Sequence, residues 1–333
     1  MDPMIVWTNA NRVEVGGSWE FALDLAYGSG DSSNDFTLTL PVDASPPAGG
    51  MAFVDGTGWG GMIDACVSDT DVAGTLNWYG RTWHGILQHK VLCPDSGQSH
   101  LVLSGSVSDC IGAIITRCGL GALMEVGDCP TELVSYQFYR YDDAWHGLRA
   151  MLASVDMRPT FDVVRTGGIV RVLVGAVHRT ANSGVADTDL GVHLTTTKRW
   201  RCTNHLVCLG AGELQNRLVR HLYADDSGNV SSTQSLIGTA EVTQAYELSS
   251  VSDAAELVAQ GTAKLRELQV HGEVEVTVDE DSPLDVGDVV NAYDARVDVA
   301  ASAEIGEVVV KIKNGVTRVT RETGTVEESG EKE

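Results

Sequence analysis

The chain has 333 residues, and its 46 acidic residues outnumber its 23 basic ones, which gives a formal net charge of -23. Such a surplus of carboxylates repels phosphate groups, so it argues against a protein that binds nucleic acid or anionic membranes. The sequence has no run of roughly 18 uninterrupted apolar residues and no secretion signal near residue 1, so we expect a protein that is first made and kept in the cytoplasm.

Hydrophobic residues make up 43% of the chain and aromatic residues only 6%, while glycine contributes 36 residues. This balance favours many short strands and turns over long helices, so we expect a mainly β protein. The seven cysteines are an odd number at irregular spacing in a long chain. We therefore expect them to be reduced thiols that fill core positions.

Residues 1–103 are predicted to form a first β domain. Apolar residues alternate with polar ones in 21–27 and 35–41, and Gly, Ser, Asn and Asp separate the two runs. Alternation of this kind is typical of half-buried strands, and the intervening residues are typical of turns. The region is therefore expected to be a meander of antiparallel strands.

The stretch WYGRTWHGILQHKVLCP, which begins at Trp78, changes its pattern part of the way along. Apolar residues fall on even positions up to Trp78 and on odd positions after Gly80. This change of inward face predicts a β-bulge at Gly80 within one bent strand. Trp83 is then expected in the core, Arg81 beside a carboxylate of a neighbouring strand or subunit, and His84 on the polar face.

Residues 104–185 are predicted to be an α+β domain. Helical spacing of apolar residues predicts one helix within 107–123, with Asp109 as its expected cap, and a second helix over 142–155. The apolar stripe of the second helix consists of Trp145, Leu148, Met151 and Leu152. A hairpin over 161–177 is expected to turn at its Gly-Gly pair.

Residues 186–324 are predicted to be strands again, interrupted by one helix over 253–268 that begins with a capping-box sequence. A terminal pair of strands is expected to turn at Asn314-Gly315. The last residues, 325–333, are polar and acidic, and we expect them to be disordered.

Two motifs resemble binding sites but lack the required spacing. An apolar strand leads into Gly210 and Gly212, as in a dinucleotide-binding motif, but Gln215 occupies the third glycine position, so a simple turn is expected. Two sets of residues could suggest zinc: Cys202, His205 and Cys208, and Cys110, Cys118 and Cys129. Neither set contains two Cys-x2-Cys hooks. The sequence therefore predicts no enzyme, no cofactor and no metal site.

Several short motifs occur in a fixed order along the chain: NDF (34–36), WGGMID (59–64), YGRTWHGIL with KVLCP (79–94), NHLVCLGAGEL (204–214), GTAEV (238–242), GTAKLREL (261–268) and DVGDVV (285–290). In this order the chain resembles the tail-tip, or baseplate-hub, proteins of long-tailed phages and prophages. The resemblance covers nearly the whole sequence.

The resemblance implies a fold and an assembly. The regions 1–103 and 186–324 would be two β-barrel domains like those of the tail tube, and 104–185 would be a small α/β domain between them. Three copies would form a ring that continues the sixfold tail tube, with phage DNA passing through without being bound. An acidic inner wall would suit that passage, because it gives the phosphates no cationic partner.

The same resemblance implies partners and a location. The expected partners are the distal tail protein, the tape-measure protein and other tail-tip proteins, first in the host cytoplasm during assembly and then in the tail of the virion. The candidate structural and interface residues are Trp59, Gly80, Arg81, Trp83, Asn204, Gly210, Gly212 and Glu213.

Two other functions remain open at the level of sequence. A β-rich tail module could bind a cell-surface saccharide, with Trp59, Trp83 or Trp145 as exposed stacking platforms. A cell-wall hydrolase component is the third possibility, although the sequence offers no catalytic motif for it.

Overall fold

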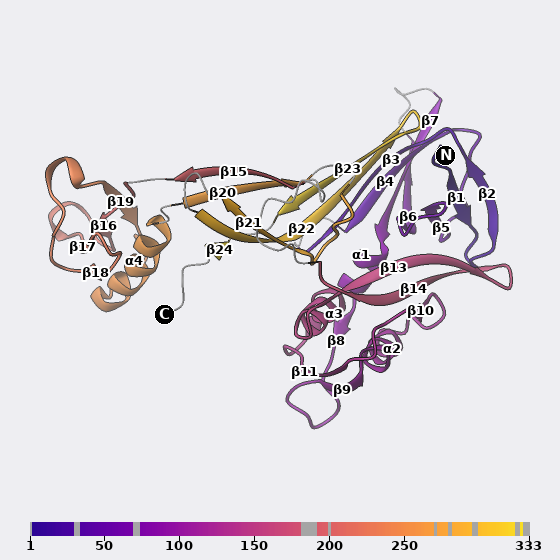
Figure 1. The fold of residues 1–333 in the computed structure, drawn as a ribbon, viewed down its shortest axis with the longest axis horizontal. Coiled ribbons are helices and arrows are strands. Elements are labelled where there is room, and N and C mark those ends of the chain that lie inside the picture. Colours follow the sequence, from indigo (N-terminus) through magenta and orange to yellow (C-terminus); the bar gives the residue numbers. More distant parts are fainter. Residues whose placement is uncertain are drawn as a thin grey trace. The chain divides into compact units, whose positions relative to one another are not determined.

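The computed structural model describes residues 2–29, 34–68, 74–180, 192–198, 201–269, 272–278, 282–294, 299–323 and 327–328. The chain divides into two compact units (Figure 1). The first unit consists of residues 1–194, 276–293 and 300–333, and the second of 195–275 and 294–299. Strands far outnumber helices among the described residues, so the expectation of a mainly β protein is confirmed.

A large antiparallel sheet forms the framework of the first unit. Its strands are β1 (Ile5–Thr8), β2 (Glu14–Ser18), β3 (Ala22–Gly28), β4 (Asp35–Pro41), β5 (Met51–Val54), β6 (Gly60–Val67), β7 (Thr75–Thr82), β21 (Val289–Asp294), β22 (Val299–Lys313), β23 (Val316–Thr323) and β24 (Glu327–Glu328). They pair in the order β2-β1-β5-β6-β7-β4-β3-β22-β21, and β23 and β24 also pair with β22. Among the described strands β2 pairs with β1 alone, so the sheet is open and no closed barrel is found.

The expected strands over 21–27 and 35–41 are confirmed as β3 and β4. Their alternate residues are buried, and Leu25 lies opposite Phe36 across the ladder. The C-terminal hairpin β22–β23 turns at Asn314 and Gly315, both with positive φ, as a two-residue hairpin turn requires. It pairs with β3, with Val310 opposite Leu25, so this part of the region 186–324 belongs to the first sheet.

The prediction of one bent strand with a bulge at Gly80 is wrong. β7 ends at Thr82, and the helix α1 (Trp83–Gln88) follows directly, with the Thr82 hydroxyl accepting from the Gly85 N–H. The inward face changes because a helical period replaces a strand period. The register shift lies instead in β6, after Ile63 and opposite Gly80.

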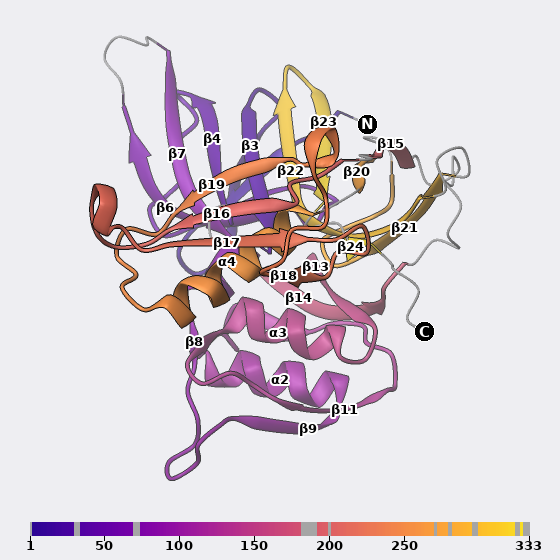
Figure 2. The same cartoon turned by 90° about the vertical axis from the view of Figure 1, so that its left-hand side faces the viewer.

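Two helices and three small sheets form the predicted α+β region. The elements are β8 (Val91–Leu92), β9 (Val102–Ser106), α2 (Val107–Arg117), β10 (Met124–Val126), β11 (Leu133–Gln137), β12 (Asp142–Asp143), α3 (Ala144–Ala153), β13 (Met157–Thr166) and β14 (Ile169–His178). Ser106, and not Asp109, caps α2, while the Asp109 carboxylate accepts from the Ser106 hydroxyl. The two helices lie side by side (Figure 2). The apolar stripe of α3 is fully buried, and the β13–β14 hairpin turns at Gly167 and Gly168, as predicted.

The second unit is a four-stranded sheet with one covering helix. Its elements are β16 (His205–Leu209), η2 (Leu214–Asn216), β17 (Val219–Ala224), β18 (Val230–Ser231), η3 (Gly238–Ala240), β19 (Thr243–Glu247) and α4 (Ala254–Leu268). The strand order is β18-β17-β16-β19, and its core includes Leu206, Cys208, Leu222, Leu257 and Leu265. The predicted helix over 253–268 is confirmed, and Asp253 caps it.

The second barrel expected over 186–324 is not found among the described residues. Besides the four-stranded sheet, β15 (Val192–Lys198) pairs with β20 (Gly272–Val278). Of the acidic tail, Glu327–Glu328 pair with β22 as β24, while 325–326 and 329–333 lie outside the described residues. Within the described part of the chain, no helix is long and apolar enough to span a membrane.

Candidate functional site

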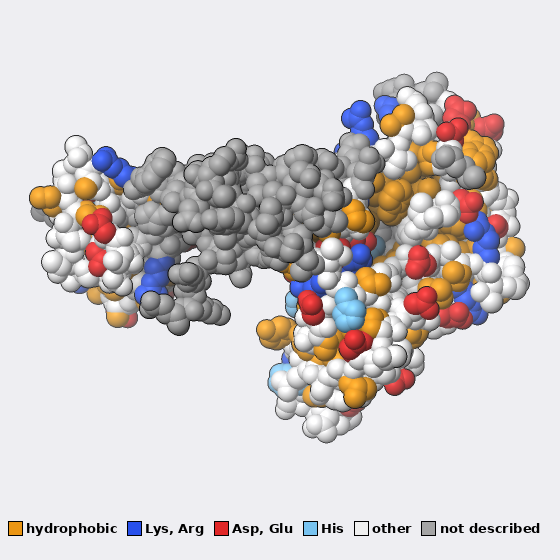
Figure 3. Space-filling view, in the orientation of Figure 1, with side chains coloured by type: hydrophobic (Ala, Val, Ile, Leu, Met, Phe, Trp, Pro, Cys, Tyr) orange, Lys and Arg blue, Asp and Glu red, His pale blue; other side chains and the backbone are white. Residues whose placement is uncertain are grey.

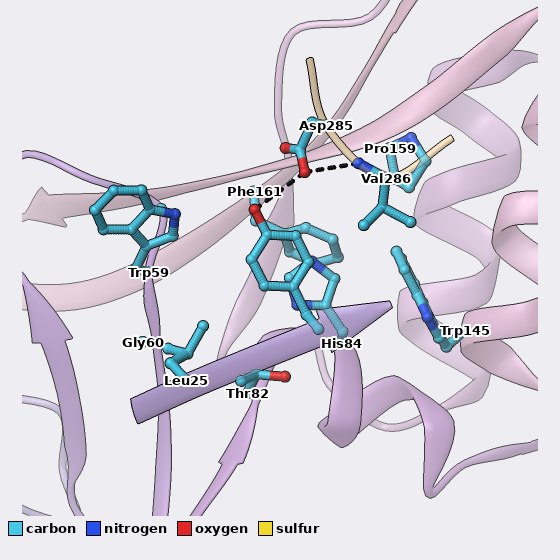
Figure 4. Close-up of a pocket in the computed structure, with 12 residues that line it drawn as sticks. Leu25, Trp59, Gly60, Thr82, His84, Trp145, Pro159, Phe161, Asp285 and Val286 are labelled. Carbon is cyan, nitrogen blue, oxygen red and sulfur yellow. Dashed lines mark hydrogen bonds between the residues drawn. The ribbon is translucent and has the colours of Figure 1, made fainter. Parts of the chain in front are cut away.

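A cavity of about 110 Å³ lies in the first unit, where the main sheet meets α1, α3, β13 and the turn before β21 (Figure 4). We call residues 282–288 the cavity turn. The aromatic side chains that line the cavity come from five separate elements: Tyr27, Trp59, His84, Trp145 and Phe161. Asp285 and Val286 of the cavity turn complete the lining. The site therefore unites segments that lie far apart in the sequence.

His84 lies at the centre of the aromatic group. Its ring stacks on Tyr27 with 4.3 Å between centroids, and Phe161 and Trp145 approach it edge-on at 4.4 and 4.8 Å. Burial, and to a smaller extent the charge of Arg149, lowers the pKa of His84 to about 3. The imidazole is therefore neutral near pH 7. The expectation that His84 lies on the polar face is wrong, because α1 turns it under the sheet.

Two hydrogen-bond donors of the lining, on Tyr27 and Trp145, already have acceptors within the protein. The Tyr27 hydroxyl donates to Asp285 Oδ1 at 3.0 Å, and the Trp145 indole N–H donates to the Gly28 carbonyl oxygen at 2.7 Å. Burial, and then the charge of Asp285, raises the pKa of Tyr27 well above its usual value. In contrast, no described group lies within hydrogen-bonding distance of the buried His84 Nδ1.

Asp288 fixes the cavity turn to the hairpin β13–β14. Its carboxylate is completely buried and accepts from Arg158 Nε at 2.9 Å and from the backbone N–H groups of Thr180 and Asp285 at 2.8 Å each. The Arg158 guanidinium also lies 3.8 Å from Asp285 Oδ2. One guanidinium thus holds both carboxylates of the turn, a link for which the sequence offered no signal.

Gly80 and Arg81 lie side by side on β7 and contact β6. Two nitrogens of the Arg81 guanidinium, Nε and Nη2, donate to the two oxygens of the Asp64 carboxylate at 2.8 Å each. Asp64 is the extra residue of β6, so the expected pair between Arg81 and a neighbouring strand is present. Hydrogen bonds from Arg81 lower the pKa of Asp64. A Cβ at Gly80 would lie 1.9 Å from the Met62 carbonyl oxygen, so the bulged strand fits only glycine there.

The two predicted tryptophans differ in exposure. Trp83 is fully buried, and its indole N–H donates to the Gly58 carbonyl oxygen at 3.0 Å, next to Trp59 at the rim of the cavity. Trp59 is half-buried. Since Trp83 and Trp145 are both buried, neither offers the exposed stacking platform that a saccharide-binding role was expected to use.

The four remaining candidates belong to the second unit. Asn204 links two segments, because its Nδ2 donates to the Ala240 carbonyl oxygen at 2.7 Å and its Oδ1 accepts from the Val242 N–H at 2.9 Å. Gly210 and Gly212 form a turn into η2 and β17, with a positive φ at Gly212, so the expectation of a simple turn is confirmed. Glu213 is exposed beside it. These four positions lie in loops of the second unit, and Asn204 also lines a cavity there.

A histidine pair in the second unit was not predicted. His205 Nδ1 lies 2.6 Å from Glu241 Oε1, and its Nε2 lies 2.8 Å from His221 Nδ1. The parallel pairing of β16 with β19 brings Glu241 close, and no local pattern reveals that pairing. Cys208 points into the opposite, core face of β16, so the suspected Cys202, His205 and Cys208 set does not converge.

One cluster of the described residues has the spacing of metal ligands, formed by Asp142, Asp143 and His146. All three residues already make hydrogen bonds at the N-terminus of α3. Asp143 caps the helix by accepting from the His146 N–H, and the His146 imidazole is paired with Asp142 at 2.8 Å. The arrangement is that of a helix start.

No family model and no curated protein matches this sequence. Solved structures that are similar to this chain include the tail protein from Neisseria meningitidis MC58 (13% identity, 97% of each chain covered, TM-score 0.44) and the prophage MuSo2 43 kDa tail protein from Shewanella oneidensis (12% identity, 96% of this chain and 98% of that chain, TM-score 0.44). A third is the prophage tail protein gp18 from Listeria monocytogenes EGD-e (10% identity, 98% and 95% covered, TM-score 0.46). All three of these solved structures are tail proteins.

Proposed function

We propose that this chain is a structural protein of a phage or prophage tail, the hub at the tail tip, and that three copies form a ring that continues the tail tube. The observation that carries the proposal is the ordered set of motifs along the sequence. Residues of those motifs make contacts between elements of the fold. Gly80 and Arg81 of β7 pair with β6, the Asn204 side chain is hydrogen-bonded to a neighbouring loop, and Asp288 connects the cavity turn to β13.

The open edges of the main sheet support an assembly. β2 and β23 each have one side without a partner among the described strands, and such edges pair readily with other chains unless they are protected. Val15 on β2 is 51% exposed and Val316 on β23 is 58% exposed. Neighbouring copies in a closed ring would cover both edges.

The proposed role involves no catalysis. The titratable groups around the cavity hold elements together: Asp288 and Arg158 fix the cavity turn, and Tyr27 is tied to Asp285. The proposed partners are the distal tail protein, the tape-measure protein and further tip components, and the proposed location is the tail of the virion after assembly in the host cytoplasm.

An acidic inner wall remains part of the proposal, because DNA has to slide through the ring without binding. The face of the first unit in Figure 3 carries acidic side chains interspersed with hydrophobic and basic ones. In a ring, the acidic surplus is expected to concentrate around the axis. A ring structure with that surplus on its outer surface would contradict this part.

Mass photometry of the purified chain tests the assembly. A trimer should appear at three times the protomer mass of 35.5 kDa. A variant with Lys in place of Val15 and Val316 should dissociate, because charge on both edges opposes strand pairing. A strict monomer for the unmodified chain across micromolar concentrations would contradict a ring that forms on its own.

Saccharide binding remains a second candidate because of two other aromatic residues. Tyr139 is 70% exposed and Tyr141 is 58% exposed, in the loop before α3. Exposed aromatic faces are typical stacking surfaces for sugars. Retention on immobilised cell-wall saccharide that is lost with Tyr139→Ala and Tyr141→Ala would favour this candidate.

A further inference from the structure

One carboxylate oxygen in the cavity lining, Asp285 Oδ2, accepts no hydrogen bond from the described residues. The hydroxyl hydrogen of Tyr27 is used by Asp285, and the indole N–H of Trp145 is used by the Gly28 carbonyl. What remains is the second carboxylate oxygen of Asp285, whose nearest described cation is the Arg158 guanidinium at 3.8 Å, and the His84 ring, whose neutral form offers one lone pair and one N–H. The Asp285 side chain is 37% exposed, so its second oxygen is open to a charged donor that arrives from solvent. A group that suits this cavity therefore brings N–H donors.

The walls favour a flat group. Tyr27, Trp59 and Phe161 line the cavity, and Figure 4 shows Phe161 below Asp285 with Trp59 to one side. Aromatic faces attract cations, and the guanidinium group combines positive charge with a planar shape that stacks on such faces. It carries five N–H donors and no acceptor, which complements the second oxygen of Asp285 and the one lone pair of the His84 ring.

The size of the cavity limits the ligand. A cavity of about 150 Å³ accommodates benzene, so the 110 Å³ here suits a head group of roughly four to six heavy atoms. The cavity is partly open to solvent, which gives an alkyl chain a way in. A guanidinium head on an alkyl stem fits both features.

The charges around the cavity determine how strongly it is expected to bind a cationic head group. Arg158 already lies 3.8 Å from Asp285, and Arg321 donates to the Leu284 carbonyl in the same turn. Arg149 lies 5.7 Å from the Trp145 ring, so the Asp285 end is the one that suits a further cation. These neighbours weaken the attraction, whereas the net charge of -23 favours the approach of a basic partner. The expected affinity of an isolated head group is therefore modest.

We propose that the cavity receives the guanidinium group of an arginine side chain presented by another protein, with Asp285 as its acceptor and Tyr27, Trp59 and Phe161 as its walls. The site is a docking point for a basic partner segment. It goes beyond the hub role, and it holds whether or not the chain forms a ring.

The test is a titration of the full chain, followed by ligand-observed NMR and by tryptophan fluorescence, since Trp59 and Trp145 line the cavity. Three probes are compared: N-acetyl-arginine methylamide, its citrulline analogue with a neutral group of the same shape, and free methylguanidinium. The arginine probe should bind saturably in the millimolar range, and the citrulline probe should bind roughly tenfold more weakly.

Asp285→Asn removes the charge and keeps an oxygen that can accept from Tyr27 and Val286, so the cavity turn should persist. The arginine probe should bind this variant roughly tenfold more weakly. Asp95→Asn is the matched control, because that carboxylate is 63% exposed and pairs with Arg117. Should Asp285→Asn fail to fold, Trp59→Leu removes one wall and should weaken binding roughly threefold.

Four results would overturn the proposal. The first is equal binding of the arginine and citrulline probes, and the second is unchanged binding by Asp285→Asn. The third is the absence of saturable binding up to about 50 mM probe. Binding of methylguanidinium without binding of the capped arginine would overturn the assignment to a protein side chain in favour of a free cation.

Discussion

Gly80→Ala is expected to disrupt the main sheet where β6 carries its extra residue. A Cβ at position 80 would lie 1.9 Å from the Met62 carbonyl oxygen and 2.7 Å from the Phe36 ring. Ordinary contacts begin at 3.4 Å, so β6 and β7 would have to move apart. The bulge at Asp64 cannot shift freely, because Arg81 holds its carboxylate at two points.

The size of the effect follows from the nature of the clash. Inserting a methyl group into a packed site usually costs about 1–3 kcal/mol, and the upper end applies because the first atom met is backbone. We expect Gly80→Ala to lower the free energy of unfolding by about 3 kcal/mol. At roughly 2–4 °C per kcal/mol for a unit of this size, Tm should fall by roughly 6–12 °C.

Urea unfolding and differential scanning calorimetry measure this loss. Gly121→Ala is the control, because a Cβ there meets nothing within 4 Å, and its effect should stay within about 0.5 kcal/mol. A free energy of unfolding for Gly80→Ala within about 1 kcal/mol of the unmodified chain would refute the reasoning on the bulged pair.

Three further substitutions probe the cavity and its surroundings. The pKa of His84 is about 3 in the folded chain and 6.5 in the unfolded chain, so the unfolded chain binds a proton more readily. Between pH 6.5 and about 3, this residue therefore lowers the free energy of unfolding by about 1.4 kcal/mol for each pH unit of acidification. His84→Phe should remove that slope in denaturation curves at several pH values, and an unchanged slope would contradict it. Asp288→Ala should cost about 3–5 kcal/mol in urea unfolding, because it leaves Arg158 without its closest carboxylate, and a loss below about 1 kcal/mol would be inconsistent with this lock. The lowered pKa of Asp64 contributes stability that is present above the ordinary pKa and is lost as pH falls through the folded pKa. Arg81→Met should raise the pKa of Asp64 in an NMR titration of its carboxyl carbon, and an unshifted titration would show that Arg81 is not the cause.

The elements that the sequence predicted correctly are those with local signals. Alternation predicted β3 and β4, and the buried stripe predicted α3. The Gly-Gly and Asn-Gly residue pairs predicted the turns at Gly167-Gly168 and Asn314-Gly315, where the structure has positive φ. Each of these patterns depends on residues that are close together in the chain, so tertiary contacts did not overrule them.

The start of α1 shows why a local pattern can mislead. A shift of the apolar face from even to odd positions follows equally from a bulge and from a switch to helical period. Thr82 was the available clue, since its hydroxyl caps the helix. With the helix in place, His84 becomes buried and Trp83 keeps its predicted place in the core.

The cavity and the open sheet could not be predicted from local patterns. Tyr27 and Asp285 are 258 residues apart, and their hydrogen bond depends on the return of the chain end to β3. Arg158 and Asp288 likewise meet only in the folded chain. The sequence contains the residues of this site but no spacing that links them.

The proposed ring is tested most directly by electron cryomicroscopy of the purified chain at micromolar concentration. The hub proposal predicts particles with threefold symmetry around an open axis, in which the β2 and β23 edges are covered by neighbouring copies. Single-copy particles, or an assembly without a central opening, would contradict it.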